Sequence, residues 1–406
     1  MQLCAYEFKD AIMSDLKAFA LGCREWLEAN CPEKMRQPIT SDKDLCWGGR
    51  NCEFQSEEQK IWLERMVAKG WTVPSWPKEY GGAGLSRKEE IILKKEMARI
   101  GARPPLSSFG IWMLGPALLK FGTEDQKLEH LPPVARGEIR WCQGYSEPSA
   151  GSDLASLATK CEDKGDHFIV NGQKVWTSYA DKADWIFCLV RTDNTGKKHH
   201  GISFVLFDME TPGVEARPIK LISGRSPFCE TFFEDVRVEK KNLVGTRDKG
   251  WDVAKYLLTH EREMIGGQGQ LEGQGRPLHE IAAGSLGLEN GHLADPMLRA
   301  HIAEAEIDEW AFGLTVARKL AEAKAGASLG ADSSMLKYYG TELNKRKYEL
   351  MMDATGHDGL EWESDRSNDG KMARGWLRTK GNSIEGGTSE VQLNIISKHI
   401  LQLPGA

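Results

Sequence analysis

The sequence lacks a hydrophobic run long enough to cross a membrane and lacks the cysteine pattern of a secreted protein. No apolar stretch approaches the roughly 18 residues that a membrane-spanning helix needs. The N-terminal residues carry charges throughout and contain no apolar core of a signal peptide. The nine cysteines are an odd number and include no C-x-x-C pair, which favours reduced thiols over a disulfide framework. We therefore expect a cytoplasmic protein without a membrane span.

Motifs for metal, nucleic-acid and dinucleotide binding are missing too. The ten histidines form no H-E-x-x-H motif, and the nearest cysteine pair, Cys46 and Cys52, is more typical of two free thiols than of a metal site. The formal net charge is −6, and no basic stripe with interleaved aromatic residues is present, so we expect no nucleic-acid surface. No strand leads into G-x-G-x-x-G and a helix. Any bound nucleotide must therefore be held by a different architecture.

The remaining features indicate a large globular protein whose chain has three regions with different secondary-structure patterns. The 406 residues are 40 % hydrophobic and 28 % charged, which suits two or three domains. Residues 1–138 have helical periodicity, as in 86–100, and are interrupted by Pro/Gly loops. Residues 139–246 read as short β-strands, with an Asn171-Gly172 hairpin pattern. Residues 247–406 are helical again, with Ala-rich segments at 297–328 and 331–354. The predicted fold class is α+β, with three domains in the order α, β, α.

The first stretch that indicates a site is QGYSEPSAGSDLAS, residues 143–156. Small residues such as Gly151 let a backbone approach a ligand closely, and the hydroxyls of Ser146 and Ser152 can donate hydrogen bonds to it. Taken alone, the same stretch is equally typical of a simple Pro/Gly turn.

The second stretch is NGQKVWTSYADKADW, residues 171–185. Trp176 follows the predicted hairpin, and its indole suits stacking on a flat conjugated ring. Thr177 and Ser178 beside it could reach the edge of such a ring. Taken alone, Trp176 also fits a core tryptophan.

The third stretch is GNSIEGGTSEVQ, residues 381–392. It places the carboxylate of Glu385 beside Gly386 and Gly387, which allow a ligand to come close. Residues 389–392 match the S-x-x-Q form of a capping box, so we predict that a helix begins there, from about 388 to 401. The free N–H groups of its first turn favour an anionic or polar ligand.

Together, the order α–β–α, the YSEPSAGSD and NGQKVWTS motifs and the C-terminal EGGTSEVQLNIISKHILQLP closely resemble the acyl-CoA dehydrogenases. The resemblance covers almost the whole chain. It implies an N-terminal helical domain, a middle β-barrel domain and a C-terminal four-helix domain, with FAD between the last two. It also implies cofactor-facing roles for residues of all three motifs, which are Gln143, Tyr145, Ser146, Gly151, Ser152, Trp176, Thr177, Ser178, Thr388 and Glu390.

The resemblance further implies α,β-desaturation of an acyl-CoA thioester by a carboxylate base, with Ser152 also facing the CoA part. Many members carry the base directly before the Gly-Thr of the C-terminal motif, which in this chain is Gly386, so Glu385 stands one residue too early. Other members carry it on the first long C-terminal helix. There, Glu261 lies on an apolar face with Leu257, three and four residues being one helical turn. We therefore predict Glu261 as the base. The alternatives are a salt-bridge role for Glu261, Glu385 as the base, and a base outside this chain.

Two further residues belong to the predicted substrate site. The backbone N–H of Gly386 could polarise the thioester carbonyl. Arg262, next to the predicted base, is either a pocket residue or a structural one.

A second departure concerns assembly. The family usually has R-x-x-F-G in the C-terminal domain, where its Arg reaches a neighbouring subunit's FAD. The corresponding residues 289–298, ENGHLADPML, contain neither the Arg nor the Phe-Gly. We expect an oligomer of the dimer-of-dimers type, homomeric or with an unlike second chain, that passes electrons to an electron-transfer flavoprotein. The alternatives are an inactive partner subunit and a flavin-dependent oxidase or monooxygenase on the same fold.

Overall fold

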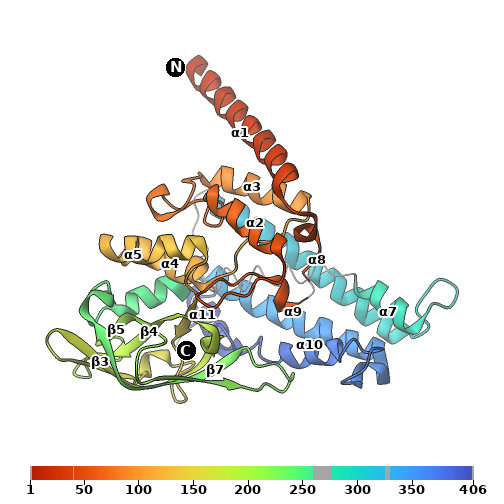
Figure 1. The fold of residues 1–406 in the computed structure, drawn as a ribbon. Helices are drawn as coiled ribbons and strands as arrows, with labels where there is room; N and C mark the ends of the chain where they lie inside the picture. The colour runs from red at the N-terminus through yellow and green to blue at the C-terminus, as the bar shows by residue number, and fades with distance from the viewer. Residues whose placement is uncertain (1, 40, 259–276, 325–329, 405–406) are drawn as a thin grey trace. The chain divides into compact units, whose positions relative to one another are not determined.

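The computed structural model describes residues 2–39, 41–258, 277–324 and 330–404 (Figure 1). By contacts between Cα atoms, the chain divides into two compact units. The first consists of residues 1–218 and 228–257, and the second of residues 219–227 and 258–406. Each unit is considered on its own below.

The N-terminal part of the first unit is helical, as predicted. Its α-helices are α1 (Gln2–Asn30), α2 (Glu57–Ala68), α3 (Arg87–Arg99), α4 (Gly115–Phe121) and α5 (Glu124–Arg136). Short 3-10 turns η1 (Glu33–Arg36), η2 (Asp42–Asp44) and η3 (Lys78–Tyr80) and a π-helical turn, η4 (Gly110–Leu114), connect them. The helix predicted over 86–100 is confirmed as α3. A capping box begins it: the Ser86 hydroxyl accepts the Glu89 N–H, and the Glu89 carboxylate accepts the Ser86 N–H.

The rest of the first unit is a mixed sheet of eight strands. They are β1 (Trp141–Gly144), β2 (Lys160–Asp163), β3 (His167–Ser178), β4 (Trp185–Arg191), β5 (Ile202–Asp208), β6 (Val214–Ile219), β7 (Phe228–Glu239) and β8 (Leu243–Val244). The order is β6-β7-β3-β2-β4-β5-β8, and β1 pairs with β4 in parallel. The turns η5 (Leu154–Ser156), η6 (Ala180–Lys182) and η7 (Lys240–Asn242) lie between strands.

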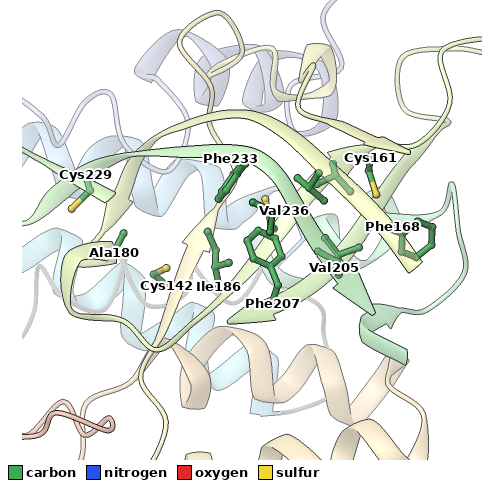
Figure 2. Close-up of a cluster of buried hydrophobic side chains, with 14 residues drawn as sticks. Cys142, Cys161, Phe168, Ala180, Ile186, Val205, Phe207, Cys229, Phe233 and Val236 are labelled. Carbon is green, nitrogen blue, oxygen red and sulfur yellow. The ribbon is translucent and has the colours of Figure 1, made fainter. Parts of the chain in front are cut away.

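The core of this sheet is built from apolar side chains of several strands (Figure 2). β4 and β5 are buried almost throughout, which explains why their sequences are nearly continuous hydrophobic runs. Figure 2 shows Phe207 and Phe233 pointing toward each other from β5 and β7, with ring centroids 5.2 Å apart. Each such buried ring contributes about 1.5–3 kcal/mol. This core fixes the strands from which the candidate site projects.

The predicted Asn171-Gly172 hairpin is wrong. Both residues lie inside β3, which runs on to Ser178, and a register shift against β7 lies between Val170 and Gly172. The Asn171 side chain donates to the Asp235 carboxylate at 3.0 Å and accepts the Asp235 N–H at 2.8 Å. The Asn-Gly pair therefore forms a bulge held by a partner 64 residues away, rather than a local turn.

Following the sheet, a helix occupies residues 250–258. The described helices of the second unit are α7 (Leu278–Leu286), α8 (Pro296–Lys324), α9 (Asp332–Thr355), α10 (Lys371–Thr379) and α11 (Ser389–His399), with the 3-10 turn η8 (Gly356–Leu360). The two predicted Ala-rich helices are confirmed as α8 and α9. α9 is central, because it packs against α7, α8, α10 and α11. Residues 219–227 belong to this unit through Arg374, whose Nη1 donates to the Ser223 carbonyl at 3.0 Å.

The beginning of α11 differs by one residue from the predicted capping box. Thr388, not Ser389, is the N-cap, and its hydroxyl accepts the Val391 N–H at 3.3 Å. Gln392 does not return to the cap, because its amide is used on the preceding glycines. Among the described helices, none is both long and apolar enough to span a membrane.

Candidate functional site

A buried ion pair fastens the first predicted motif to the second. The Lys174 Nζ lies 2.8 Å from Oε1 of Glu147 and 3.1 Å from the Tyr145 carbonyl oxygen. The backbone adds a further bond, since the Val175 N–H donates to the Ser146 carbonyl at 2.8 Å. Residues 145–147 are thus held against residues 174–175 of β3. Two stretches separated by some 30 residues in sequence form one surface.

Glu147 is satisfied on both carboxylate oxygens. Besides Lys174, it accepts the N–H groups of Ala158 at 2.7 Å and Thr159 at 2.9 Å. Burial by itself raises the pKa of Glu147, but the Lys174 charge and these hydrogen bonds together lower the pKa below its usual value. The carboxylate is therefore held ionised as a structural anchor. It is not arranged as a proton acceptor.

Trp176 has an unusual conformation beside this anchor. Its φ is 62°, in the left-handed region that bulky residues rarely adopt. It sits at a second register shift of β3, between Lys174 and Thr177. Its side chain is 54 % exposed, with the ring edge-on to Phe228 at 6.0 Å. Strained backbone of this kind costs about 1–3 kcal/mol and is concentrated at ligand-binding positions. Trp176 is thus a presented indole and not a core tryptophan.

The two residues after Trp176 point differently. The Thr177 side chain is fully buried, and its hydroxyl has no hydrogen-bond partner among the described residues. A ligand contact by Thr177 would therefore involve its backbone. Ser178 is half-buried and ends β3, paired with Phe228 of β7. Its hydroxyl is consequently near the surface that carries the Trp176 indole.

The other predicted residues of the first motif fall into two groups. Gly151 and Ser152 are exposed, and a Cβ built on Gly151 would meet nothing within 4 Å. Gln143 and Ser146 are half-buried. Tyr145 is buried and packs edge-on against two phenylalanine rings of β4 and β5. The Tyr145 side chain therefore stabilises the turn by packing in the core.

This donor set fits a flat, partly polar ring system. An exposed, fixed indole offers an apolar face. Half-buried serine hydroxyls offer hydrogen bonds at the edges, and an open glycine turn leaves room for backbone approach. The residues that would hold FAD on this unit are therefore Gln143, Ser146, Gly151, Ser152, Trp176 and Ser178.

The third motif is a glycine turn held by two buried side chains. Gly386 and Gly387 have φ values of 65° and 94°. Lys337 of α9 is 1 % exposed and donates to the carbonyls of Asn382 at 3.0 Å and Gly387 at 2.8 Å. The side-chain amide of Gln392 donates to the Gly386 carbonyl at 3.0 Å. Burial lowers the pKa of Lys337. With its carbonyls engaged, the turn leaves its N–H groups as the available donors.

Glu385 is occupied in this turn. Its carboxylate accepts from Arg378 Nη2 at 2.7 Å and from Asn382 Nδ2 at 2.7 Å. By contrast, the Gly386 N–H has no hydrogen-bond partner among the described residues. Both carboxylate oxygens of Glu385 therefore have donors, and the identity of the base stays a prediction. Thr388 caps α11, and Glu390 is exposed in its first turn.

The predicted base Glu261 and its neighbour Arg262 lie outside the described residues. The structure adds three residues that sequence reasoning missed, Glu147, Lys174 and Lys337. One indication was available for Lys174: it shares the inward parity of Phe168 and Val170 on β3. Nothing local distinguishes Lys337 from any other lysine on a helix.

Comparison with known proteins gives matches over nearly the whole chain. Sequence profiles of the N-terminal, middle and C-terminal domains of acyl-CoA dehydrogenase match residues 38–138, 142–236 and 248–401. The chain is 36 % identical to the acyl-CoA dehydrogenase IpdE1 of Mycobacterium tuberculosis, over 97 % of this chain and 99 % of the relative.

Solved structures give the same result. A steroid acyl-CoA dehydrogenase, Tcur3481-Tcur3483, matches with a TM-score of 0.75 at 28 % identity, over 97 % of this chain and 98 % of the other. The ChsE4-ChsE5 complex from Mycobacterium tuberculosis matches with a TM-score of 0.72 at 29 % identity, with the same coverage.

Proposed function

This chain belongs to the acyl-CoA dehydrogenase family, the FAD-dependent oxidoreductases that act on CH–CH bonds, and we propose how its residues divide the α,β-dehydrogenation of an acyl-CoA thioester. The observation that carries the assignment of the flavin surface is the strained, exposed Trp176 beside a turn fixed by the Lys174–Glu147 pair. Bound FAD would supply the hydride acceptor for the substrate's β-carbon. Trp176 packs beside the cofactor, and Ser178 and Ser146 orient it by hydrogen bonds.

The proton at the substrate's α-carbon is removed by Glu261. Glu385 is not available for this role, because Arg378 and Asn382 hold its carboxylate. The Gly386 N–H stabilises the negative charge that develops on the thioester oxygen. Ser152 faces the CoA part, Thr388 and Glu390 face the cofactor from the first turn of α11, and Arg262 lines the substrate site.

A hetero-oligomer is the second part of the proposal. The chain lacks the R-x-x-F-G motif at 289–298, and two of its structural neighbours carry the names of two unlike chains, Tcur3481-Tcur3483 and ChsE4-ChsE5. We place this chain as the base-carrying member of such an assembly. Its location is cytoplasmic, its electron acceptor is an electron-transfer flavoprotein, and its sequence domains are 1–138, 139–246 and 247–406.

Anaerobic mixing of the flavin-loaded protein with a panel of acyl-CoA esters tests the activity directly. Loss of the flavin absorbance with at least one ester is the expected result. Failure of every ester, with the chain alone and with a co-expressed partner, would contradict the proposal. Fast reoxidation of the reduced flavin by oxygen would instead indicate an oxidase.

The assembly is tested by flavin content and mass. We expect the chain alone to bind FAD incompletely and to gain full occupancy with an unlike partner chain. A purified homomer with one FAD per chain would contradict the heteromer, without touching the dehydrogenase assignment.

A further inference from the structure

Two thiols meet beside a cleft of about 660 Å³ in the first unit. Cys46 is 4 % exposed and forms a small apolar cluster with Leu63 and Leu106. The half-buried Cys52 packs against the same cluster, and the Cys46 thiol donates a hydrogen bond to the Cys52 sulfur. Cys52 also lines the cleft. One member of the pair can therefore be reached from the cleft, and the other lies behind it.

The loop between the two cysteines holds them together. Gly48 and Gly49 adopt left-handed φ values of 68° and 104°, which turn the chain so that Cys52 returns to Cys46. The Cys46 carbonyl accepts the Ser107 N–H at 2.7 Å, and the Cys52 N–H donates to the Gly49 carbonyl at 3.1 Å. The contact between the thiols is thus set by the backbone on both sides.

The two thiols differ in acidity. The hydrogen bond from Cys46 lowers the pKa of Cys52 to about 7, although burial opposes this shift. The Gly48 N–H and the Arg140 charge lower the pKa of Cys52 further, whereas the Asp184 carboxylate raises it. The same hydrogen bond, together with burial, raises the pKa of Cys46. Cys52 is therefore the thiolate of the pair, and Cys46 keeps its proton.

The other cysteines provide a contrast within the same chain. Those whose side chains the structure describes are buried, and burial raises the pKa of each thiol: Cys23, Cys31, Cys142, Cys161, Cys188 and Cys229. Buried protonated thiols react slowly, whereas an accessible thiolate beside a second thiol is the arrangement of a redox-sensing cysteine and its resolving partner.

The charges of the cleft restrict the class of oxidant. Four carboxylates line it, those of Glu53, Asp181, Asp184 and Glu210, and three cations, Lys43, Arg140 and Lys182. The lining therefore has no excess of positive charge that would attract an anionic oxidant such as oxidised glutathione. A small uncharged hydroperoxide is indifferent to these charges and reaches Cys52 without displacing them.

We propose that Cys46 and Cys52 are a modification site, at which a small hydroperoxide forms a reversible disulfide. The Cys52 thiolate attacks one peroxide oxygen, the O–O bond breaks, and the departing hydroxide takes a proton from solvent to become water. The Cys46 sulfur then attacks the Cys52 sulfenic acid, the S–O bond breaks, and the Cys46 proton leaves with the hydroxyl as a second water. The two sulfurs lose two electrons, which reduce hydrogen peroxide to two waters. This inference goes beyond the proposed function and does not depend on it.

The disulfide would close a loop that joins the N-terminal helical part of the first unit to the sheet. Arg50 lies between the two cysteines, and its backbone N–H donates to the Asp184 carboxylate at 3.0 Å. Its guanidinium pairs with Asp208 and Glu210. A covalent bond across this loop suppresses its local opening. Hydrogen exchange of peptides from 44–60 should therefore slow several-fold on oxidation and recover with dithiothreitol, and unchanged exchange would contradict this closure.

Tryptic peptide mass spectrometry of the flavin-loaded protein, after brief treatment with hydrogen peroxide, tests the proposal without measuring turnover. Trypsin cleaves after Arg50, so the disulfide joins two peptides, 44–50 and 51–60. We expect this linked pair to form with at least about tenfold less peroxide than the buried cysteines require, and dithiothreitol should separate it. Oxidation of the buried cysteines before any linked pair forms would overturn the proposal. A faster reaction with oxidised glutathione than with peroxide would overturn the assigned oxidant.

Single variants assign the two roles. In Cys46→Ser, the oxidation of Cys52 should stop at the sulfenic acid, which dimedone captures, because the resolving thiol is gone. In Cys52→Ser, Cys46 should stay reduced at the same peroxide concentration. Cys31→Ser removes a buried cysteine of the same helical part and is the matched control, in which the linked pair should form as in the wild type. Oxidation of Cys46 in Cys52→Ser at the rate of the wild-type pair would contradict Cys52 as the attacking thiol. The wild-type peptide result stands even if a serine variant fails to fold.

Discussion

Two turns that we propose bind ligands are each held by a buried lysine. The two lysines differ in the groups that stabilise their positive charge. In the first unit, Lys174 has a carboxylate partner, Glu147, at 2.8 Å. In the second, Lys337 has two backbone carbonyls, those of Asn382 and Gly387, at 3.0 and 2.8 Å. One turn is fixed by an ion pair and the other by ion–dipole contacts.

This difference determines what each turn presents. The ion pair at Glu147 neutralises its own charge, so the surface above it is left to the neutral groups of Trp176 and the serines. Around Gly387, lysine and amide donors engage the carbonyls, and the Gly386 N–H has no hydrogen-bond partner among the described residues. The first arrangement suits a flat conjugated ring, and the second suits an oxygen that becomes negative. The comparison leads to predictions that separate the two regions.

Removing the lysine should be most harmful in the first region. Lys174→Met leaves Glu147 buried without its partner, and a broken buried pair costs about 3–5 kcal/mol in the free energy of unfolding. Urea unfolding measures the total, and hydrogen exchange of peptides from 143–178 locates it. Lys174→Met/Glu147→Gln should recover part of the loss, because no buried charge then remains. If the free energy of unfolding of Lys174→Met lies within about 1 kcal/mol of the wild-type value, the ion pair is not what anchors this turn.

The same change in the second region should cost less. Lys337→Met deletes charge-assisted bonds to two carbonyls but leaves no buried acid, and we expect a loss of about 2–3 kcal/mol. Faster hydrogen exchange should be confined to peptides near 381–392. Lys345 on the same helix, half-buried and paired with Glu342, is the control, and Lys345→Met should cost under about 1 kcal/mol. Equal costs for the two variants would contradict a special role for Lys337.

The two regions should also respond to opposite ends of the pH scale. The folded pKa of Glu147 is lowered from 4.5, so its contribution is complete above pH 4.5 and is lost as the pH falls through the folded value. The folded pKa of Lys337 is lowered from 10.5, so the free energy of unfolding gains as pH rises from the folded value toward 10.5. Hydrogen exchange against pH should show acid loosening 143–178 first. The difference in unfolding free energy between wild type and Glu147→Gln should shrink over the same acid range.

The elements were predictable from sequence where their causes are local. The period of α3 and its Ser86–Glu89 cap lie within a few residues of one another, and so do the runs that form β4 and β5. The Asn171-Gly172 hairpin was wrong because Asp235, far along the chain, holds Asn171 in a bulge. The partners of Lys174 and Lys337 are equally remote, and no spacing rule indicates them.

The motifs that form the candidate site were predictable from the sequence, but the buried side chains that hold these motifs in place were not. Gly151, Ser152 and Trp176 are exposed, as a ligand contact requires, and their roles toward a cofactor stay predictions. That Thr177 points inward follows from the register shift before it, which a strand's simple alternation does not reveal. The capping residue moved from Ser389 to Thr388 because two adjacent hydroxyl residues can both serve.

Replacing one glycine in each turn should have a smaller effect on the free energy of unfolding than replacing the lysines. Gly387→Ala places a Cβ 2.5 Å from Gln392 Nε2 in a left-handed conformation, so we expect a loss of about 1–2 kcal/mol. Gly151→Ala meets open space and should stay within about 0.5 kcal/mol while lowering FAD affinity, since a backbone approach is blocked. Unfolding and flavin titration of both variants check this. The reverse ranking in stability would show that the second turn is the looser one.

The assignment of the proton acceptor is tested most directly by comparing Glu261→Gln with Glu385→Gln in anaerobic single-turnover reduction of the bound flavin. The account predicts that Glu261→Gln slows reduction about 10²–10⁴-fold, the usual contribution of a general base. Glu385→Gln, which changes only the contacts with Arg378 and Asn382, should slow it by less than about tenfold. Normal reduction by Glu261→Gln together with a large loss in Glu385→Gln would contradict the account.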